Sequence, residues 1–155
     1  DIEIFSFDND KVHVLSIIRE NKKQILDVLK LTTDSYYYRI ERIREADKIP
    51  YIYHKSYLPE QYINPNYPNI DYYNSIYNRL ELDYGVDLNE ENFIETNEIL
   101  FPAPKNICKQ LEINESEPVV FQTKLSSLSE NNKPIEYVES YKKWNFYKIQ
   151  LQSNN

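Results

Sequence analysis

The chain has 155 residues, 41% of them hydrophobic, which predicts one globular domain with a sizeable core and argues against intrinsic disorder. Its 18 lysines and arginines against 25 aspartates and glutamates give a formal net charge of −7, which argues against holding nucleic acid or an anionic membrane by overall attraction. The single glycine, Gly85, excludes a glycine-rich phosphate loop, and the single cysteine, Cys108, excludes an internal disulfide and a zinc site of several thiolates.

The sequence carries no signal of a membrane protein or of several domains. No run approaches the roughly 18 apolar residues of a membrane span, and no basic-then-apolar signal segment opens the chain. No internal repeat or Ser/Gly linker divides it, so we expect residues 1–155 to form one domain. The expected setting is the reducing cytoplasm, without a membrane partner.

The first predicted elements are a strand, a short helix and a hairpin. Residues 12–19 have strand character, and Asn21 is a good N-cap for the helix that follows. Residues 36–46 and 50–58 both alternate between side-chain types, and the polar pair at 47–48 suits a tight turn. This pattern predicts an antiparallel hairpin.

The middle of the chain predicts a loop, two helices and a strand between them. Residues 59–69, rich in proline and asparagine, are expected to form a loop. Residues 71–84 place apolar side chains at helical spacing, and Gly85 is the expected left-handed stop of that helix. Residues 92–101 are expected to form a strand, and a proline in the first turn predicts a short helix over 105–111.

The C-terminal part predicts a second long hairpin and a final strand. Residues 117–128 and 134–141 flank a polar turn at 129–133, and residues 146–151 are expected to add the last strand. The whole order of elements predicts the α+β class, an antiparallel sheet with two or three flanking helices.

Two arginines of the first hairpin are the clearest candidates for binding. In the strand 36–46, Arg42 and Arg44 share a face with apolar residues, because strand side chains repeat every two residues. Arginine is rarely buried unless it is paired, so a buried-facing pair needs an acidic partner or an anionic ligand. The alternative is that this face is exposed to solvent, with Tyr37 and Ile43 on the core side.

Few other residues suggest chemistry. A lone histidine such as His54, in the strand 50–58, is more often structural than ligand-binding. With only two histidines and one cysteine in the chain, we expect no metal site. A nucleophile–base pair of Cys108 and His54 stays open, although Cys108 occupies an apolar helical position, where an inert buried thiol is the usual outcome. No paired carboxylates at catalytic spacing indicate a glycosidase or a protease.

Polar side chains also occur at a helix start and in the second hairpin. The hydroxyl of Ser75 can cap the predicted helix, although Asp71 could do so instead, or it can help exposed N–H groups to hold an anion. In the strand 134–141 and just beyond it, Glu136 and Lys142 share a face and offer one acid and one base.

Three motifs follow one another along the chain. Residues 39–59 read RIERIREADKIPYIYHKSYLP, residues 74–88 read NSIYNRLELDYGVDL, and residues 131–149 read NNKPIEYVESYKKWNFYKI. In order and spacing they resemble the effector-binding (UTRA) domain of GntR-type transcription regulators of the HutC subfamily. The intervening LFPAPKNICKQLEINESEPVVFQTK is similar to that family's short helix and following strand, so the resemblance covers nearly the whole chain.

The resemblance implies a chorismate-lyase-like fold, homodimerisation and a small-molecule effector bound between sheet and helices, without catalysis or a cofactor. Family members carry a winged helix-turn-helix domain ahead of this one. Operator DNA would then be contacted only through such an N-terminal domain, which residues 1–155 do not contain. The acidic charge fits a regulatory half that does not itself touch DNA.

The family's effector-binding positions fall on a defined set of residues here. They are two strand arginines, a serine and a tyrosine at a helix start, an acid of the second hairpin and a serine before the first strand: Arg42, Arg44, Ser75, Tyr77, Glu136 and Ser6. His54 stands where many members have an acidic residue and Lys142 where they have Tyr or His, and both are included as candidates. These departures favour an anionic effector, onto which arginines can fork.

The function implied by the resemblance is that of the effector-sensing half of a dimeric transcriptional repressor, which responds to an anionic metabolite such as a sugar phosphate. One alternative is an enzyme on the same fold, a lyase that acts on an aromatic carboxylate with the help of Arg42 and Glu136. Another is a stand-alone interaction module with an empty, tyrosine-lined groove.

Overall fold

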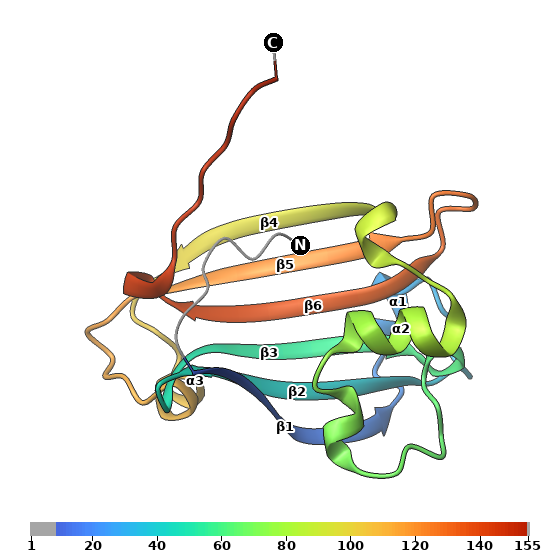
Figure 1. Cartoon of the computed structure of the whole chain (residues 1–155), viewed down its shortest axis with the longest axis horizontal. Coiled ribbons are helices and arrows are strands. Elements are labelled where there is room, and N and C mark those ends of the chain that lie inside the picture. The colour runs from blue at the N-terminus through green and yellow to red at the C-terminus, as the bar shows by residue number, and fades with distance from the viewer. Residues whose placement is uncertain (1–8, 155) are drawn as a thin grey trace.

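The computed structural model describes residues 9–154, and its centre is a six-stranded antiparallel sheet (Figure 1). The sheet consists of β1 (Asp10–Glu20), β2 (Tyr37–Ala46), β3 (Ile49–Pro59), β4 (Asn92–Leu100), β5 (Val119–Ser127) and β6 (Pro134–Lys143). Their order across the sheet is β1-β2-β3-β6-β5-β4, so the three earlier strands form one half and the three later strands the other. The expected α+β class with an antiparallel sheet is confirmed.

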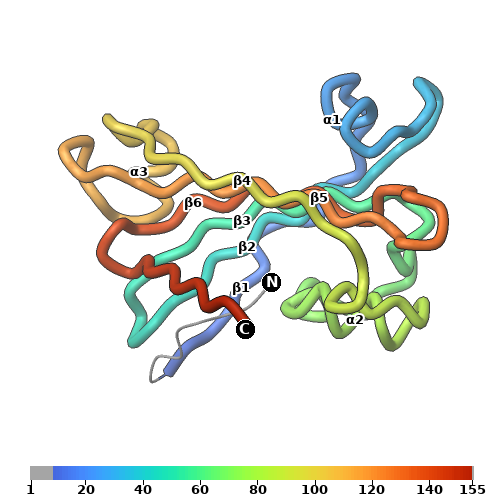
Figure 2. Tube along the Cα trace, turned by 90° about the horizontal axis from the view of Figure 1, so that it is seen from above, coloured from blue at the N-terminus to red at the C-terminus, as the bar shows by residue number. Residues whose placement is uncertain are grey.

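Helices cover both faces of the sheet. The α-helices within residues 9–154 are α1 (Lys23–Val28), α2 (Ile76–Tyr84) and α3 (Lys105–Leu111), and the 3₁₀ helices are η1 (Glu60–Tyr62), η2 (Ile70–Tyr73), η3 (Leu88–Glu90) and η4 (Trp144–Phe146). Figure 2 shows α1 and α3 on one face and α2 on the other. In this part of the chain, no helix has the length and apolar character needed to cross a membrane.

Each α-helix buries an apolar core against the sheet. The helix residues that enter these cores are Leu26 and Leu29 at α1, Ile76 and Leu80 in α2, and Ile107 and Leu111 in α3. On β2, Ile40 packs beneath α2, whereas Tyr37 packs beneath α1 and Ile43 beneath α3. Burying one such side chain stabilises the fold by about 1.5–3 kcal/mol. Neither face of β2 is therefore left to solvent, so the alternative of a solvent-exposed arginine face is wrong.

The β2–β3 hairpin closes at the turn that the sequence predicted. Asp47 and Lys48 have φ angles of 49° and 67°, as the two central residues of a type I′ turn require. The two strands pair from Tyr37 opposite Pro59 to Ala46 opposite Ile49. The predicted hairpin is confirmed, and it places the arginines of β2 next to the centre of the sheet.

The helix expected over residues 71–84 is interrupted, and the interruption matters for the site. It consists of η2 and then α2, with Asn74 and Ser75 between them. Ser75 has an extended backbone and its Oγ accepts a hydrogen bond from the N–H of Asn78 at 3.4 Å, so it is the N-cap of α2. Gly85, with a φ of 67°, ends α2 in the left-handed conformation, as expected.

Two local expectations are wrong. Asn21 does not cap α1, whose N-cap residue is Lys22 and whose first turn has no side-chain cap. Residues 146–151 do not add a strand, because the chain leaves the sheet at η4 and continues to 154 without regular structure. The Phe146 ring instead stacks on the Tyr51 ring, with 5.1 Å between their centroids.

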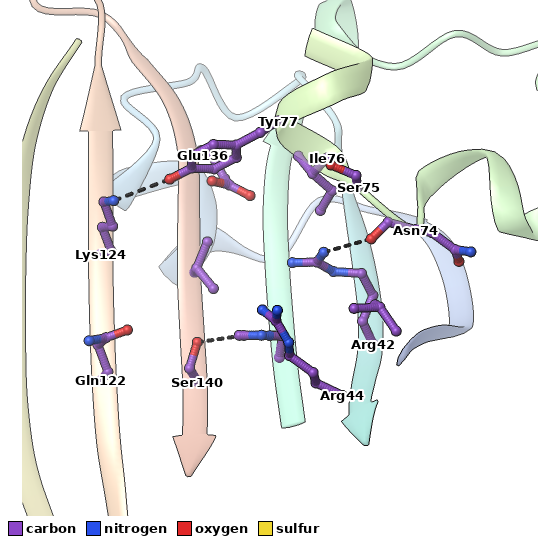
Figure 3. Close-up of a pocket in the computed structure, with 13 residues that line it drawn as sticks. Arg42, Arg44, Asn74, Ser75, Ile76, Tyr77, Gln122, Lys124, Glu136 and Ser140 are labelled. Atoms are coloured by element: carbon purple, nitrogen blue, oxygen red, sulfur yellow. Dashed lines mark hydrogen bonds between the residues drawn. The ribbon is translucent and has the colours of Figure 1, made fainter. Parts of the chain in front are cut away.

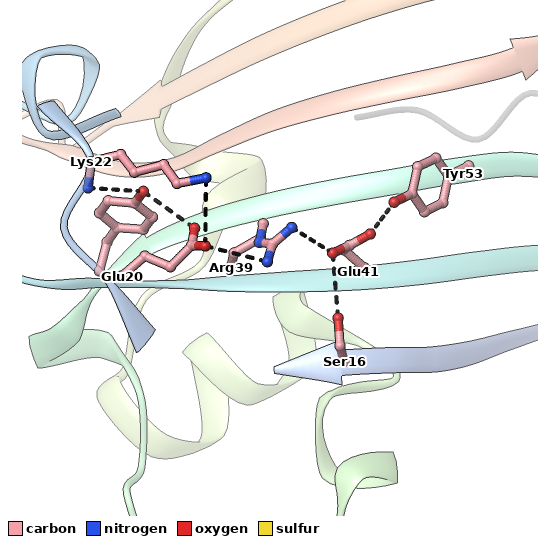
Figure 4. Close-up of polar contacts among 7 residues, drawn as sticks. Ser16, Glu20, Lys22, Arg39, Glu41 and Tyr53 are labelled. Carbon is pink, nitrogen blue, oxygen red and sulfur yellow. Dashed lines mark hydrogen bonds and ion pairs between the residues drawn. The ribbon is translucent and has the colours of Figure 1, made fainter. Parts of the chain in front are cut away.

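Charged side chains on the face covered by α1 and α3 pair with one another (Figure 4). Arg39 on β2 lies 3.3 Å from Oε2 of Glu20 and 2.7 Å from Oε2 of Glu41. Glu41 also accepts hydrogen bonds from the hydroxyls of Tyr53 and Ser16. This polar network, which we call the Arg39 network, ties β1, β2 and β3 together.

Candidate functional site

A cavity of about 360 Å³ lies between the sheet and the start of α2 (Figure 3). Six residues that the sequence singled out line it: Arg42, Arg44, His54, Ser75, Tyr77 and Glu136. They come from β2, β3, β6 and the start of α2, so the fold brings together segments that are far apart in the sequence.

Strand pairing builds one wall of this cavity as a row of polar residues across the sheet. Arg42 lies opposite His54, His54 opposite Ser140, and Ser140 opposite Gln122. Directly opposed residues of antiparallel strands point to the same face. The row therefore presents four neighbouring polar side chains to the space beneath α2.

Arg42 connects this row to the start of α2. Its Nη1 donates a hydrogen bond to the main-chain carbonyl of Asn74 at 3.1 Å, next to the N-cap residue Ser75. The first N–H groups of a helix, its dipole, a guanidinium and a hydroxyl together favour a bound anion. The buried Oδ1 of Asn74, which has no hydrogen-bond partner among residues 9–154, is an acceptor and would favour a donor group instead. The helix start, Arg42 and Ser75 thus provide groups that can hold an anion.

Arg44 lines the cavity but is engaged by an acid. Its Nε lies 3.1 Å from both carboxylate oxygens of Asp10, its Nη2 donates to Oδ2 at 2.9 Å, and Tyr51 donates to Oδ1 at 3.0 Å. The Arg44 and Asp10 side chains are only 21% and 16% exposed. A ligand that uses Arg44 must therefore take the place of the Asp10 carboxylate.

His54 contributes a neutral group. Its Nδ1 lies 2.7 Å from the Oγ of Ser140. Burial lowers the pKa of His54 well below its usual value of 6.5, because burial penalises the charged form. The positive charges of Arg42, Lys142 and Arg44 act in the same direction. At neutral pH the imidazole is a hydrogen-bonding group without charge.

Glu136, Lys124 and Tyr77 meet on the β5–β6 side of the cavity. Lys124 Nζ donates a hydrogen bond to the Tyr77 hydroxyl at 3.1 Å. Glu136 is 1% exposed, and its Oε1 has no hydrogen-bond partner among the residues described. Burial raises the pKa of Glu136, and the positive charges of Arg42 and Lys124 oppose that rise. Burial also raises the pKa of Tyr77, so its hydroxyl remains protonated at neutral pH.

The two remaining candidate residues are Ser6 and Lys142. Ser6 lies outside the described residues. Lys142 is not among the residues that line the cavity, and its Nζ lies 5.6 Å from the centroid of the Tyr147 ring. Lys142 reaches the site through its charge, which lowers the pKa of His54.

Four polar residues of the cavity wall were not predicted: Asn74, Gln122, Lys124 and Ser140. Asn74 and Ser140 lie inside the motifs that were recognised, so the motifs could have supplied them. Gln122 and Lys124 share the cavity face of β5. Their alternation was visible in the sequence, but only the pairing of β5 with β6 shows that this polar face is enclosed.

The structure separates the residues of the possible nucleophile–base pair. Cys108 is buried in the core of α3, where its Sγ donates to the carbonyl of Ala103 at 3.6 Å, whereas His54 lines the cavity on the opposite face. The Cys108–His54 pair is therefore wrong. Among residues 9–154, no group of three or more His, Cys, Asp and Glu side chains could hold a metal ion.

Comparison with known proteins places this fold. The family model of the UTRA domain matches residues 9–148. No curated protein matches the chain in sequence. Among solved structures, a GntR-family transcriptional regulator from Enterococcus faecalis V583 is similar with a TM-score of 0.76 and 22% identity, over 92% of this chain and 99% of that chain.

Two other solved structures have a similar fold. The ligand-binding domain of a GntR-family transcriptional regulator from Bordetella bronchiseptica has a TM-score of 0.81 at 16% identity, over 97% of this chain and 99% of that one. PhnF from Mycobacterium smegmatis has a TM-score of 0.81 at 14% identity, over 94% of this chain and 63% of its own. These structures share the fold, and the family match extends over nearly all of the described residues, so the chain belongs to the UTRA domain family.

Proposed function

We propose that this domain senses an anionic metabolite, such as a sugar phosphate, on behalf of a dimeric transcription regulator of the GntR type. Membership of the UTRA family and the fold shared with a ligand-binding domain of such a regulator support the regulatory role. The observation that carries the ligand class is the cavity, which gathers positive side chains at the start of a helix.

The anionic part of the ligand is assigned to the corner formed by Arg42, Ser75 and the first turn of α2. The guanidinium is already positioned there by its bond to Asn74. The hydroxyl of Ser75 accepts from Asn78, which leaves its proton available to a ligand oxygen. Arg44 adds a second guanidinium where the ligand replaces Asp10.

The size of the cavity limits the ligand. A volume of about 360 Å³ lies at the small end of the range for ligand pockets, roughly 300–1,000 Å³. It suits a metabolite of monosaccharide size better than a nucleotide or a lipid. Glu136 and Tyr77 then face the uncharged part of that metabolite, for which a buried acid is a suitable hydrogen-bond acceptor.

Dimerisation is assigned to the β4 edge of the sheet. β4 stands at one end of the strand order, and in residues 9–154 it pairs only with β5. Four large apolar residues on or beside this strand are more than half exposed: Phe93, Ile94, Ile99 and Phe101. An exposed apolar edge strand is prone to pair with another chain. Size-exclusion chromatography with light scattering should show a dimer that an Ile94→Asp, Ile99→Asp variant disrupts.

The regulatory mechanism requires parts beyond this domain. Contact with operator DNA is assigned to a winged helix-turn-helix domain on the N-terminal side, in the cytoplasm. Effector binding would shift the dimer between arrangements that hold those domains in or out of register with the operator half-sites. Such a shift requires that the effector bind the two arrangements with different affinities.

A thermal-shift screen of sugar phosphates, amino acids and fatty acids tests the proposal. We expect one phosphorylated metabolite to raise the melting temperature by several degrees, because a ligand that binds only the folded state stabilises it. The Arg42→Ala variant should lose this rise, and Arg19→Ala should keep it, since Arg19 is an exposed residue paired with Glu60 outside the cavity. A panel without any hit would contradict the proposal.

No catalytic step is part of this function. Incubation with chorismate followed by product detection separates it from the lyase alternative. We expect no conversion of chorismate. Product formation at an enzymatic rate would contradict the sensor function and support the lyase.

A further inference from the structure

Lys124 is a buried cation of the cavity that no carboxylate of residues 9–154 engages in an ion pair. It is 5% exposed, and its one hydrogen bond in this part of the chain goes to the Tyr77 hydroxyl at 3.1 Å. The Phe93 ring centroid lies 4.5 Å from Nζ. An ammonium group has three protons to donate, and lysine is almost never fully buried unless it is paired. Lys124 therefore has donor capacity that no hydrogen bond within residues 9–154 uses.

Glu136 is the complementary group next to it. Lys124 lies opposite Val138 and Glu136 lies opposite Ser126, so the two charged residues are diagonal neighbours on one face of β5 and β6. The Oε1 atom of Glu136 has no hydrogen-bond partner in the described part of the chain. Lys124 thus has donor protons, and Glu136 an oxygen near the hydroxyl of Ser56, for which residues 9–154 offer no hydrogen bond of standard geometry.

Lys124 is distant from the corner that Arg42 forms with α2, and Glu136 on β6 lies between the two. Arg42 is on β2 and Lys124 is on β5, and the strand order β2-β3-β6-β5 puts three strand spacings between them, roughly 14 Å of backbone separation. Figure 3 shows Arg42 turned toward Asn74 and Lys124 turned toward Tyr77. A phosphate held at Arg42 leaves Lys124 and Glu136 to another part of the ligand.

The chemistry of that part follows from the two groups. It must accept a hydrogen bond from Lys124 and donate one to Glu136. A hydroxyl does both. A carboxylate cannot donate and is repelled by Glu136, whereas an ammonium cannot accept and is repelled by Lys124.

We propose that Lys124, acting together with Glu136, is a specificity-determining residue that selects ligands with a hydroxyl group at the β5–β6 end of the cavity. The inference rests on the proposed function and narrows its ligand class to phosphorylated polyols and sugars. It separates two tasks within one site, because Arg42 and α2 bind the anion and Lys124 reads the hydroxyl.

The test is calorimetric titration of the chain with inorganic phosphate, glycerol 3-phosphate, ribose 5-phosphate, glucose 6-phosphate and fructose 6-phosphate. The wild type should bind at least one sugar phosphate more than about tenfold more tightly than inorganic phosphate. In Lys124→Met the affinity for that sugar phosphate should fall about tenfold or more, the usual effect of losing a hydrogen bond to a charged group, while the affinity for inorganic phosphate stays within about threefold.

Controls separate this effect from loss of folding. Lys55→Met makes the same substitution on β3, where the Lys55 ammonium lies 5.8 Å from the Tyr53 ring centroid on the other face of the sheet, and should change neither affinity. Melting curves verify that each variant is folded, and Lys124→Gln replaces Lys124→Met if the latter does not fold.

Each other outcome overturns the inference. Equal losses for phosphate and sugar phosphate in Lys124→Met would make Lys124 an anion contact, and unchanged affinities would give it no part in recognition. In both cases the anion-sensing function would stand. If the wild type bound none of the five probes, the proposed ligand class and this inference would fail together.

Discussion

Strand β2 carries arginines on both faces, and their surroundings differ between the two faces. Arg39, on the side of α1 and α3, lies between the carboxylates of Glu20 and Glu41 (Figure 4). Arg42, on the side of α2, lines a cavity and donates a hydrogen bond to the main-chain carbonyl of Asn74. In that cavity Glu136 keeps an oxygen without a hydrogen bond among the residues described.

The difference in charge pairing indicates which face of the sheet is suited to bind a ligand. Buried charges stabilise a protein best when they pair with one another, and a group left without its complement is costly. The Arg39 guanidinium pairs with two carboxylates of the protein, although its Nε has no hydrogen-bond partner among residues 9–154. In the cavity beneath α2, the proposed ligand would accept a hydrogen bond from Lys124 and donate one to Glu136. We therefore propose that the first region is structural and that the second binds the ligand.

The largest expected effect is on binding by the cavity arginine. Arg42→Ala should weaken binding of a phosphorylated ligand by about 100-fold or more, because truncating a desolvated charged contact typically costs 2–5 kcal/mol. Titration calorimetry measures it. Arg39→Ala is the matched control on the other face and should change the affinity less than about threefold. Equal losses in the two variants would erase the distinction between the faces.

Arg39→Ala, which should leave ligand affinity nearly unchanged, should instead lower the stability of the fold. Arg39→Ala leaves the carboxylates of Glu20 and Glu41 without their guanidinium and should lower the free energy of unfolding by about 2 kcal/mol. Denaturant titration checks this value. Arg19→Ala, which breaks an exposed pair with Glu60, should cost less than about 1 kcal/mol. A loss of less than about 1 kcal/mol in Arg39→Ala would show that the Arg39 network does not stabilise the fold.

A smaller effect on ligand affinity is expected at the ion pair of Arg44 and Asp10. Asp10 occupies Arg44 in this structure, and Asp10→Asn removes that charge while keeping the side-chain shape. The affinity for a phosphorylated ligand should rise about five- to tenfold, roughly 1 kcal/mol, because an internal competitor is gone. Affinity for the unphosphorylated sugar should not change. An unaltered phosphate affinity would show that Arg44 does not contact the anion.

The smallest effect concerns pH. The pKa of His54 is lowered in the folded protein, so between that pKa and about 6.5 the unfolded chain binds a proton more readily and stability falls as the pH falls. From pH 7.5 to 5.5 this contribution should cost roughly 1 kcal/mol relative to His54→Gln. The comparison of the two proteins cancels the opposite contribution of Glu136, whose pKa is raised. Parallel stability curves would contradict the burial of a neutral His54.

Local signals made much of the fold predictable. The turn at Asp47 and Lys48 and the helix stop at Gly85 are set by a few adjacent residues, and both occur where the sequence placed them. The break before Ser75 was missed because the apolar spacing runs continuously through η2 and α2. The strand expected at 146–151 failed because Phe146 packs on Tyr51, a contact that no local pattern shows.

The site was predictable only as far as its motifs extended. Arg42, Ser75, Tyr77 and Glu136 were placed by motif and do line one cavity. Lys124 was not, because its role depends on which strand lies beside β5 and which helix covers that face. Arg44 was assigned to a ligand, whereas its partner Asp10 stands 34 positions away in the sequence and meets it only through the β1–β2 pairing.

The most direct test of the central claim is to map amide chemical-shift changes by NMR while a phosphorylated sugar is titrated into the isotope-labelled chain. We expect the largest changes at Arg42, at the start of α2 and at Lys124, and far smaller changes with the unphosphorylated sugar. Changes concentrated at the Arg39 network, or no saturable change with any phosphorylated sugar, would contradict it.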